Sequence, residues 1–201
     1  MKIRESGMPG REIWEQFFDP RNILATLGLD KHMTDVAEFG CGYGTFTIPA
    51  ARVIKGKIYA FDIEPDMITL TKEEAEKQGL SNVEAIQRDF VAEGTGLPDQ
   101  SVDYGMLFNI LHIEHPEILL KESYRILKPK GKLSIIHWNY NPTTPRGPSM
   151  EIRPKPDQCI EWARRAGFAD SKQFDLNPHH YGIVVSKKGE VQSSCETRSI
   201  G

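Results

Sequence analysis

The stretch that decides the fold is Thr34-Asp-Val-Ala-Glu-Phe-Gly-Cys-Gly-Tyr-Gly-Thr-Phe-Thr-Ile-Pro-Ala50, in which an apolar run meets an acidic residue and then three glycines at alternate positions. This pattern predicts a β-strand, a tight glycine loop and a helix, the layout with which doubly wound sheets bind adenosine-containing ligands. Glycines at positions 40, 42 and 44 remove Cβ atoms where the backbone has to turn sharply and lie against a ligand.

The spacing of these glycines separates two kinds of ligand. A dinucleotide-binding loop has the pattern Gly-x-Gly-x-x-Gly, whereas here Thr45 stands where the third glycine of that pattern would be. Glu38 also places a carboxylate beside the loop, which suits a cationic ligand better than a pyrophosphate. A nicotinamide oxidoreductase is therefore disfavoured.

Glu38-x-Gly40-x-Gly42-x-Gly44 resembles the nucleotide-binding signature of class I S-adenosylmethionine-dependent methyltransferases. Three later segments resemble the same family in the expected order: Ile58–Met67, Ala85–Phe90, and Leu97–His112 followed by the Leu127–Leu133 turn. The match covers about residues 30 to 187. An ordered set of four motifs is more specific than a single glycine loop.

Strand and helix signals alternate along this region, which predicts a parallel sheet covered on both faces. The predicted strands are 34–39, 57–62, 83–88, 102–109 and 132–137, and the predicted helices are 45–54, 65–78, 116–127 and 157–166. Gln173–Leu176 and Tyr181–Lys187 then form two runs joined too closely for a crossover, so they are expected to be antiparallel. The resemblance implies a doubly wound, mostly parallel seven-stranded sheet of order 3-2-1-4-5-7-6 that ends in this hairpin.

We expect three parts: an amino-terminal helical lid (1–29), a Rossmann-like domain (30–188) and a disordered tail (189–201). Residues 11–28 contain two short helical patterns, the second starting at Asp19-Pro20 as N-cap and first-turn proline. In the family such an extension folds over the cofactor. The alternative is a helix pair that merely packs on the domain.

The resemblance implies S-adenosylmethionine as cofactor, S-adenosylhomocysteine as product and no metal. By this resemblance Glu38 would bind the ammonium group of the cofactor, and Asp62 would bind the ribose hydroxyls. Asp89 and Phe90 would contact the adenine, and Asn109 would lie beside the sulfonium. Asp89 and Phe90 have a structural alternative, a turn cap and a buried ring. The complete predicted cofactor set is Glu38, Gly40, Cys41, Gly42, Gly44, Asp62, Ile63, Met67, Asp89, Phe90 and Asn109.

Methyl transfer requires the acceptor atom to be aligned at ~3 Å and water to be excluded. A hydroxyl or activated carbon acceptor also benefits from a base. The candidates are His112, just past the fourth strand, and His137, which ends the fifth, since both are expected at the carboxyl edge of the sheet. His179 and His180, in the final hairpin, are expected to lie farther away. A structural role is the alternative for each histidine.

The acceptor pocket is expected to use aromatic side chains of the lid and of the segment after the fifth strand. Positively charged side chains in the proline-rich segment 139–155 could hold an anionic group of the acceptor, or only keep the loop soluble. The candidates are Trp14, Phe17, Phe18, Trp138 and Tyr140 for the aromatic part, and Arg146, Arg153 and Lys155 for the charged part.

Composition limits the remaining choices. The chain has 201 residues with a net charge of −3, so it predicts one soluble domain without the basic excess of nucleic-acid-binding proteins. Three widely spaced cysteines (41, 159 and 195) and the lack of a membrane-length apolar run indicate a cytoplasmic protein. We expect a monomer or a homodimer.

We therefore expect a methyltransferase that acts on a small molecule, without nucleic acid or membrane as partner. Asn109-Ile-Leu-His112 differs from the Asn-Pro-Pro-Tyr type of enzymes that methylate amino groups of nucleic-acid bases. Two alternatives stay open: a protein or RNA methyltransferase that works with a partner, and a protein that binds S-adenosylmethionine without transfer activity.

Overall fold

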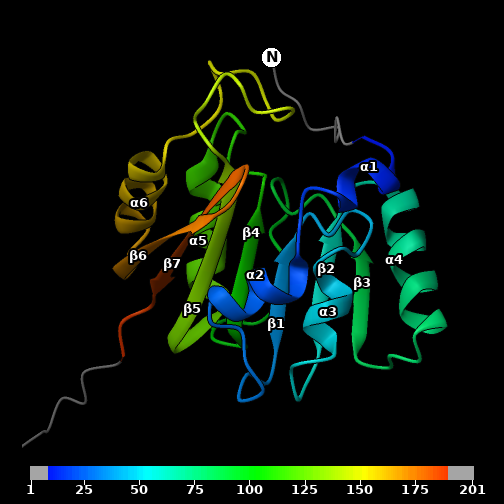
Figure 1. Ribbon diagram of the computed structural model, residues 1–201. Helices are drawn as coiled ribbons and strands as arrows, with labels where there is room; N and C mark the ends of the chain where they lie inside the picture. The colour runs from blue at the N-terminus through cyan, green and yellow to red at the C-terminus, as the bar shows by residue number, and fades with distance from the viewer. Residues whose placement is uncertain (1–8, 190–201) are drawn as a thin grey trace, which may run out of the picture.

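Seven strands form one sheet in the order β3-β2-β1-β4-β5-β7-β6 in the computed structural model, which describes residues 9–189 (Figure 1). Strands β1 to β5 pair in parallel, and β7 pairs antiparallel with both β5 and β6. The predicted fold class is thus confirmed, including the order of the strands and the closing hairpin. The strands are β1 (Val36–Phe39), β2 (Ile58–Asp62), β3 (Val83–Gln87), β4 (Val102–Phe108), β5 (Leu127–Trp138), β6 (Ala169–Leu176) and β7 (His180–Ser186).

Helices cover both faces of this sheet. On one face α3 and α4 contact β2 and β3, with α2 packed beside α3; on the other, α5 and α6 contact β4, β5 and β7 (Figure 1). The helices are α1 (Arg11–Glu15), α2 (Pro20–Thr26), α3 (Thr47–Ala51), α4 (Pro65–Lys77), α5 (Pro116–Ile126) and α6 (Pro156–Arg165).

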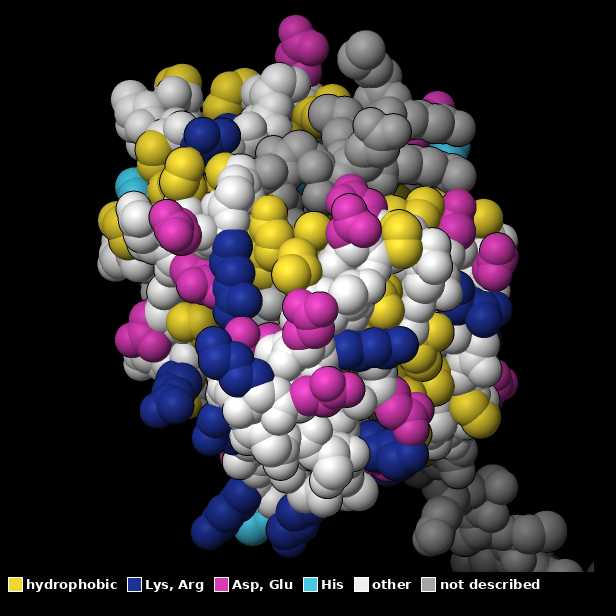
Figure 2. Space-filling view, turned by 90° about the vertical axis from the view of Figure 1, so that its right-hand side faces the viewer, with side chains coloured by type: hydrophobic (Ala, Val, Ile, Leu, Met, Phe, Trp, Pro, Cys, Tyr) yellow, Lys and Arg dark blue, Asp and Glu magenta, His cyan; other side chains and the backbone are white. Residues whose placement is uncertain are grey.

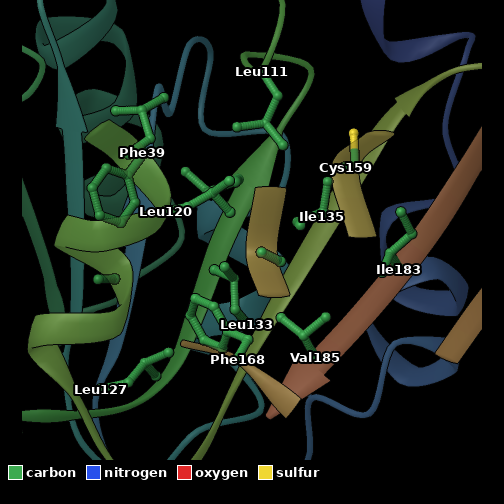
Figure 3. Packing of buried hydrophobic residues seen from close by; sticks show 14 of the residues in the cluster. Phe39, Leu111, Leu120, Leu127, Leu133, Ile135, Cys159, Phe168, Ile183 and Val185 are labelled. Atoms are coloured by element: carbon green, nitrogen blue, oxygen red, sulfur yellow. The ribbon is translucent and has the colours of Figure 1, made fainter. Parts of the chain in front are cut away.

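Each face has its own apolar core because successive side chains of a strand point to opposite sides. Leu133 and Ile135 of β5 pack with Leu120 of α5 on one side (Figure 3), whereas Ile136 belongs to the core beneath α2 and α3. Full burial of such a side chain contributes roughly 1.5–3 kcal/mol. The two cores fix the positions of the strand ends from which the site is built.

Three elements differ from their predicted bounds by three residues or more at one end. Strand β5 begins at Leu127, five residues before the predicted start, because Leu127 pairs with Val102 ahead of a register shift. Strand β6 begins at Ala169, since its pairing with β7 continues through polar residues that an exposed edge strand tolerates. Helix α3 is confined to Thr47–Ala51 within the predicted 45–54.

The two short helices predicted between residues 11 and 28 are present as α1 and α2. The Asp19 side chain accepts a hydrogen bond from the Asn22 amide at 3.2 Å, and Pro20 opens the helix, as an N-cap and first-turn proline should. Helix α1 and the loop between β5 and α6 both lie at the carboxyl edge of the parallel strands (Figure 1).

Residues 1–8 of the predicted lid and residues 190–201 of the predicted tail lie outside the described residues. Within residues 9–189, none of the helices is long and apolar enough to span a membrane. Figure 2, the face seen from the right of Figure 1, shows acidic and basic side chains interspersed.

Candidate active site

The glycine loop follows β1 and folds against the end of β2. Gly40, Gly42 and Gly44 have φ angles of 77°, 53° and 76°, a left-handed conformation that a residue with a Cβ adopts only at a cost. The amides of Gly40 and Cys41 both donate to the carbonyl oxygen of Phe61, at 2.8 and 2.9 Å. The alternate glycines are therefore what allows the backbone to lie flat across the neighbouring strand.

Asp62 ends β2 with its carboxylate fixed against this loop. One oxygen, Oδ2, accepts from the Gly42 amide at 2.9 Å, and Oδ1 accepts from the Glu64 amide at 3.0 Å. Burial raises the pKa of Asp62, and these backbone donors lower it. Because a carboxylate oxygen can accept more than one hydrogen bond, both oxygens keep capacity for a ligand's hydroxyl groups.

Glu38 lies at the level of the loop on the α3 face of the sheet, with only 2% of its surface exposed. It accepts a hydrogen bond from the Thr47 hydroxyl at 2.5 Å. Burial raises the pKa of Glu38 to about 8, the Thr47 hydrogen bond lowers it, and the negative charge of Asp62 raises it further. A cation bound beside Glu38 would favour its ionised form.

Three further residues of the predicted cofactor set lie near the start of α4. Cys41 is buried, with Sγ 3.7 Å from the Thr71 hydroxyl, and Met67 is buried in the first turns of α4. Ile63, directly after Asp62, is half-buried. The Thr71 hydroxyl also donates to the Gly42 carbonyl at 3.0 Å, which ties α4 to the glycine loop.

Asp89 and Phe90 follow β3, and within the protein Asp89 caps a turn while the Phe90 ring is buried. The Asp89 carboxylate accepts from the Ala92 amide at 3.0 Å, as in a turn cap. Phe90 is 9% exposed and packs edge-on against Phe39 of β1, with ring centroids 5.6 Å apart. Their contact with an adenine stays a prediction.

Asn109 gives the most direct indication of a ligand. It has a φ angle of 57° at the end of β4, and its amide donates to Ile136 at 2.8 Å. Both polar atoms of its side chain are buried without a hydrogen-bond partner, as is the Thr45 hydroxyl beside the glycine loop. Buried polar groups are normally paired, so these atoms fit a site that a bound polar molecule completes.

His112 and His137, the candidate bases, are adjacent. His112 Nδ1 lies 3.3 Å from His137 Nε2, and the ring planes are 79° apart. Burial lowers the pKa of His112 to about 4 and lowers the pKa of His137 well below its ordinary value. Both rings are therefore neutral near pH 7.

The predicted aromatic residues divide between the two faces of the sheet. Trp138 is 3% exposed and packs against Phe17 and His180, and Phe18 packs on the same His180 ring at 4.5 Å. Hairpin pairing sets His180 opposite Trp138, and the expectation that His180 lies farther from the acceptor than His112 and His137 stays a prediction. Trp14 contacts Phe18, with ring centroids 4.9 Å apart.

A cavity of about 770 Å³ opens on the other face of the sheet from Trp138 and Phe18, between α5, α6 and the proline-rich loop. His112, Tyr140 and Trp162 line it, and the Lys155 ammonium group, also in the lining, lies 4.6 Å from the centre of the Tyr140 ring. The other lining residues are Leu111, Ile113, Glu114, Pro116, Met150, Glu151, Ile152, Arg153, Pro154 and Gln158.

Arg153 does not serve as the anion-binding group that the sequence suggested. Its guanidinium donates to the carbonyl oxygens of Pro148, Asn139, Asn141 and Arg146 and to the Thr144 hydroxyl, which uses every N–H it has. It therefore holds the loop together. Arg146 is exposed in the same loop.

Sequence analysis missed the threonines that support the loop and the cavity residues of α6. Thr47 and Thr71 act through hydroxyl groups whose partners are set by helix packing, and no local pattern indicates such a contact. Trp162 lines the cavity only because α6 crosses beside α5. Among the described residues, no group of three side chains could hold a metal ion.

Comparison with known proteins agrees with this geometry. A family model described as "Methyltransferase domain" matches residues 30–173, well over half of the chain. The demethylmenaquinone methyltransferase of Geobacillus sp. (strain WCH70) is 29% identical over 96 residues, 46% of this chain and 40% of that protein. The chain thus matches less than half of that relative's length.

Solved structures extend the likeness over most of the chain. A SAM-dependent methyltransferase from Aquifex aeolicus has a TM-score of 0.75 and 27% identity, covering 85% of this chain and 90% of that one. Phosphoethanolamine N-methyltransferase 2 of Haemonchus contortus, solved with S-adenosyl-L-methionine, has a TM-score of 0.71 at 18% identity, with 88% and 53% covered, and shows the fold alone. The matched domain, the strand order and the glycine loop agree, and the chain belongs to the class I S-adenosylmethionine-dependent methyltransferase family.

Proposed function

We propose that the protein transfers a methyl group from S-adenosylmethionine to a small acceptor with an apolar body. The observation that carries the proposal is the pairing of the glycine loop with Asp62, in which the Gly42 amide fixes a carboxylate beside three left-handed glycines. The unpaired side chain of Asn109 supports a ligand at the same edge of the sheet.

The residues that would hold the cofactor are those of the carboxyl edge. Asp62 would accept hydrogen bonds from the ribose hydroxyls, Glu38 would face the ammonium group, and Asn109 would lie beside the sulfonium. When bound, S-adenosylmethionine supplies an electrophilic methyl group on a positively charged sulfur. Asp89 and Phe90 are the proposed contacts of the adenine, with Ile63 and Met67 packing near it.

The acceptor is proposed to occupy the cavity beside His112. Apolar side chains such as Leu111, Ile113 and Ile152 share the lining with charged and polar ones, so the cavity suits an acceptor that has an apolar body and polar groups. Arg153 has no N–H left to donate to an anionic group, so Lys155 is the lining residue that would meet one. The Geobacillus relative is named for demethylmenaquinone, so a reduced naphthoquinone is the first acceptor to test.

The cofactor is tested by calorimetric titration of the purified chain with S-adenosylmethionine, S-adenosylhomocysteine and NAD. We expect micromolar binding of the first two, lost in Asp62→Ala and kept in Asp66→Ala, an exposed residue in the first turn of α4. Binding of NAD alone would refute the proposal.

Transfer is tested with cofactor labelled in the methyl group. Reduced demethylmenaquinone is expected to take up label and phosphoethanolamine is not. Binding of the cofactor without label in either compound would direct the search to other acceptors, and label in phosphoethanolamine would refute the argument from the cavity.

A further inference from the structure

We propose that Thr71 is a positioning residue, which holds the Gly42 backbone so that the Gly42 amide fixes the Asp62 carboxylate for the ribose of the cofactor. The inference rests on the proposed function, because it takes Asp62 as the residue that binds the ribose hydroxyls. It depends on two hydrogen bonds that meet at Gly42, on the contact of Thr71 with the Cys41 thiol, and on the burial of Thr71.

The two hydrogen bonds hold Gly42 from both sides. Its amide donates to Asp62 Oδ2 at 2.9 Å, and its carbonyl accepts from the Thr71 hydroxyl at 3.0 Å. The amide and the carbonyl belong to the two planar peptide units that flank the Gly42 Cα, so the two bonds together restrain both backbone dihedrals of this residue. Glycine has more conformational freedom than any other residue. The bond from Thr71 therefore limits the directions in which the Gly42 amide can point.

The direction of each hydrogen bond in this chain is determined. The Thr71 hydroxyl has one hydrogen, and a carbonyl oxygen cannot donate, so this hydrogen goes to the Gly42 carbonyl. Cys41 Sγ lies 3.7 Å from the same hydroxyl oxygen, which is left to accept from the thiol. Burial raises the pKa of Cys41, so the thiol keeps its hydrogen near neutral pH. The contacts thus run from the Cys41 thiol through Thr71 and Gly42 to the Asp62 carboxylate.

Thr71 is wholly buried in α4, against the buried glycine loop. Without its hydroxyl, the Gly42 carbonyl would lose the hydrogen bond that satisfies it in a place closed to solvent, which is unfavourable. The loop could relieve this only by a shift at Gly42, and such a shift moves the amide that Asp62 accepts from. The Thr71 methyl group also lies against Gly44, where a Cβ would come within 3.3 Å of it, so packing is the alternative role of this side chain.

Asp62 depends on Gly42 for its orientation toward the loop. Its other oxygen, Oδ1, accepts from the Glu64 amide at 3.0 Å, but Glu64 is only two residues away along the chain. The Gly42 amide instead comes from the loop itself and sets the carboxylate relative to it. A site that is ordered before its ligand arrives does not pay for ordering on binding. Loss of the Thr71 hydroxyl should therefore weaken cofactor binding, although Thr71 is not one of the residues proposed to contact the cofactor.

Calorimetric titration of the full chain with S-adenosylhomocysteine tests the first consequence. Thr71→Val removes the hydroxyl and keeps the shape of the side chain, so affinity should fall by about 3-fold to 10-fold, the equivalent of one hydrogen bond. Thr71→Ser keeps the hydroxyl and should bind like the wild type. Thr69→Val is the matched control, because Thr69 is an exposed residue of the same helix whose hydroxyl donates to the Pro65 carbonyl. It should not change the affinity.

Carbon-13 NMR of the Asp62 carboxyl group separates positioning from packing. A hydrogen bond from an amide favours the ionised carboxylate, and the Gly42 amide lowers the pKa of Asp62 in this way. Thr71→Val should therefore raise the pKa of Asp62 in the protein without ligand, whereas Thr71→Ser should not. The other ionisable groups that act on Asp62 or feel its charge are the same in all these proteins: Glu38, Glu64 and Cys41.

The outcomes are distinct. If Thr71→Val folds, binds S-adenosylhomocysteine like the wild type and leaves the titration of Asp62 unchanged, the proposal is overturned. Equal losses of affinity in Thr71→Val and Thr71→Ser would also overturn it, because the hydroxyl would not be the cause. If Thr71→Val does not fold, Thr71→Ala takes its place in the comparison with Thr71→Ser. Absence of binding to the wild-type protein refutes the proposed function, whereas binding that these variants leave unchanged refutes only the role of Thr71.

Discussion

The carboxyl groups of Glu38 and Asp62 lie at the ends of adjacent parallel strands and oppose each other's ionisation, since the charge of Asp62 raises the pKa of Glu38. Both are buried beside the glycine loop, and burial is the larger cause of the shift. With a Glu38 pKa of about 8, this edge of the sheet holds a proton at neutral pH that a bound cation would displace.

Binding of S-adenosylmethionine should therefore release a proton from Glu38. Below pH 8 the free protein carries this proton and the complex does not, so affinity should rise by up to about tenfold per pH unit as the pH approaches 8. Titration calorimetry between pH 6 and 8.5, in buffers of different ionisation enthalpy, measures both the affinity and the proton released.

Glu38→Gln is the matched variant for this prediction. It keeps an oxygen that can accept from Thr47 and cannot titrate, and the ligand's own ionisation cancels in the ratio of the two affinities. A wild-type to variant ratio that does not change with pH would show that Glu38 supports the loop without interacting with the ligand's charge.

Gly44→Ala should destabilise the protein by more than its backbone conformation alone requires. The φ angle of 76° costs roughly 1–2 kcal/mol for a residue with a Cβ. The added Cβ would also lie 3.2 Å from the Thr71 hydroxyl and 3.4 Å from Ile48. Urea unfolding measures the loss, and cofactor titration should show weaker binding.

Gly79→Ala is the control for this substitution. Gly79 has a φ angle of 67°, but nothing lies within 4 Å of a Cβ added there. Gly79→Ala therefore strains the backbone without crowding a neighbouring side chain. Cofactor affinity should not change. Equal losses of stability in the two variants would contradict the crowding against Thr71.

Arg153→Lys should loosen the loop over the cavity. The guanidinium joins several separate carbonyl oxygens, two of them on Pro148 and Asn139, and a single ammonium group cannot reach all of them. We expect the free energy of unfolding to fall by about 1.5–3 kcal/mol, the scale of a hydrogen bond to a charged group. Limited proteolysis should cut the loop faster. Arg146→Lys, exposed in the same loop, should behave like the wild type.

The cofactor edge could be predicted from the sequence because its chemistry depends on local backbone conformation and on strand order. Alternate glycines and the acid that ends β2 are both visible in the sequence, and parallel pairing brings them together. The residues around the acceptor could not be predicted in this way, because their positions depend on which face of the sheet each side chain points to. Trp138 follows His137 directly, yet alternation sends the two to opposite faces, and hairpin register alone brings His180 to Trp138.

The buried histidines should make the protein unusually sensitive to mild acid. Burial lowers the pKa of His180 to about 3 and of His112 to about 4, whereas an unfolded histidine titrates near 6.5. As the pH falls below about 6.5, these histidines become protonated in the unfolded chain but not in the folded protein. The free energy of unfolding therefore falls by about 1.4 kcal/mol per pH unit for each such histidine.

His180→Phe keeps an aromatic ring against Phe18 and Trp138 and removes one of these titrating groups. Its loss of stability between pH 7 and 5 should therefore be smaller than that of the wild type by about 2 kcal/mol. Urea unfolding at several pH values measures this difference, with the exposed His32→Gln as control. Parallel stability curves for His180→Phe and the wild type would mean that His180 can accept a proton in the folded protein.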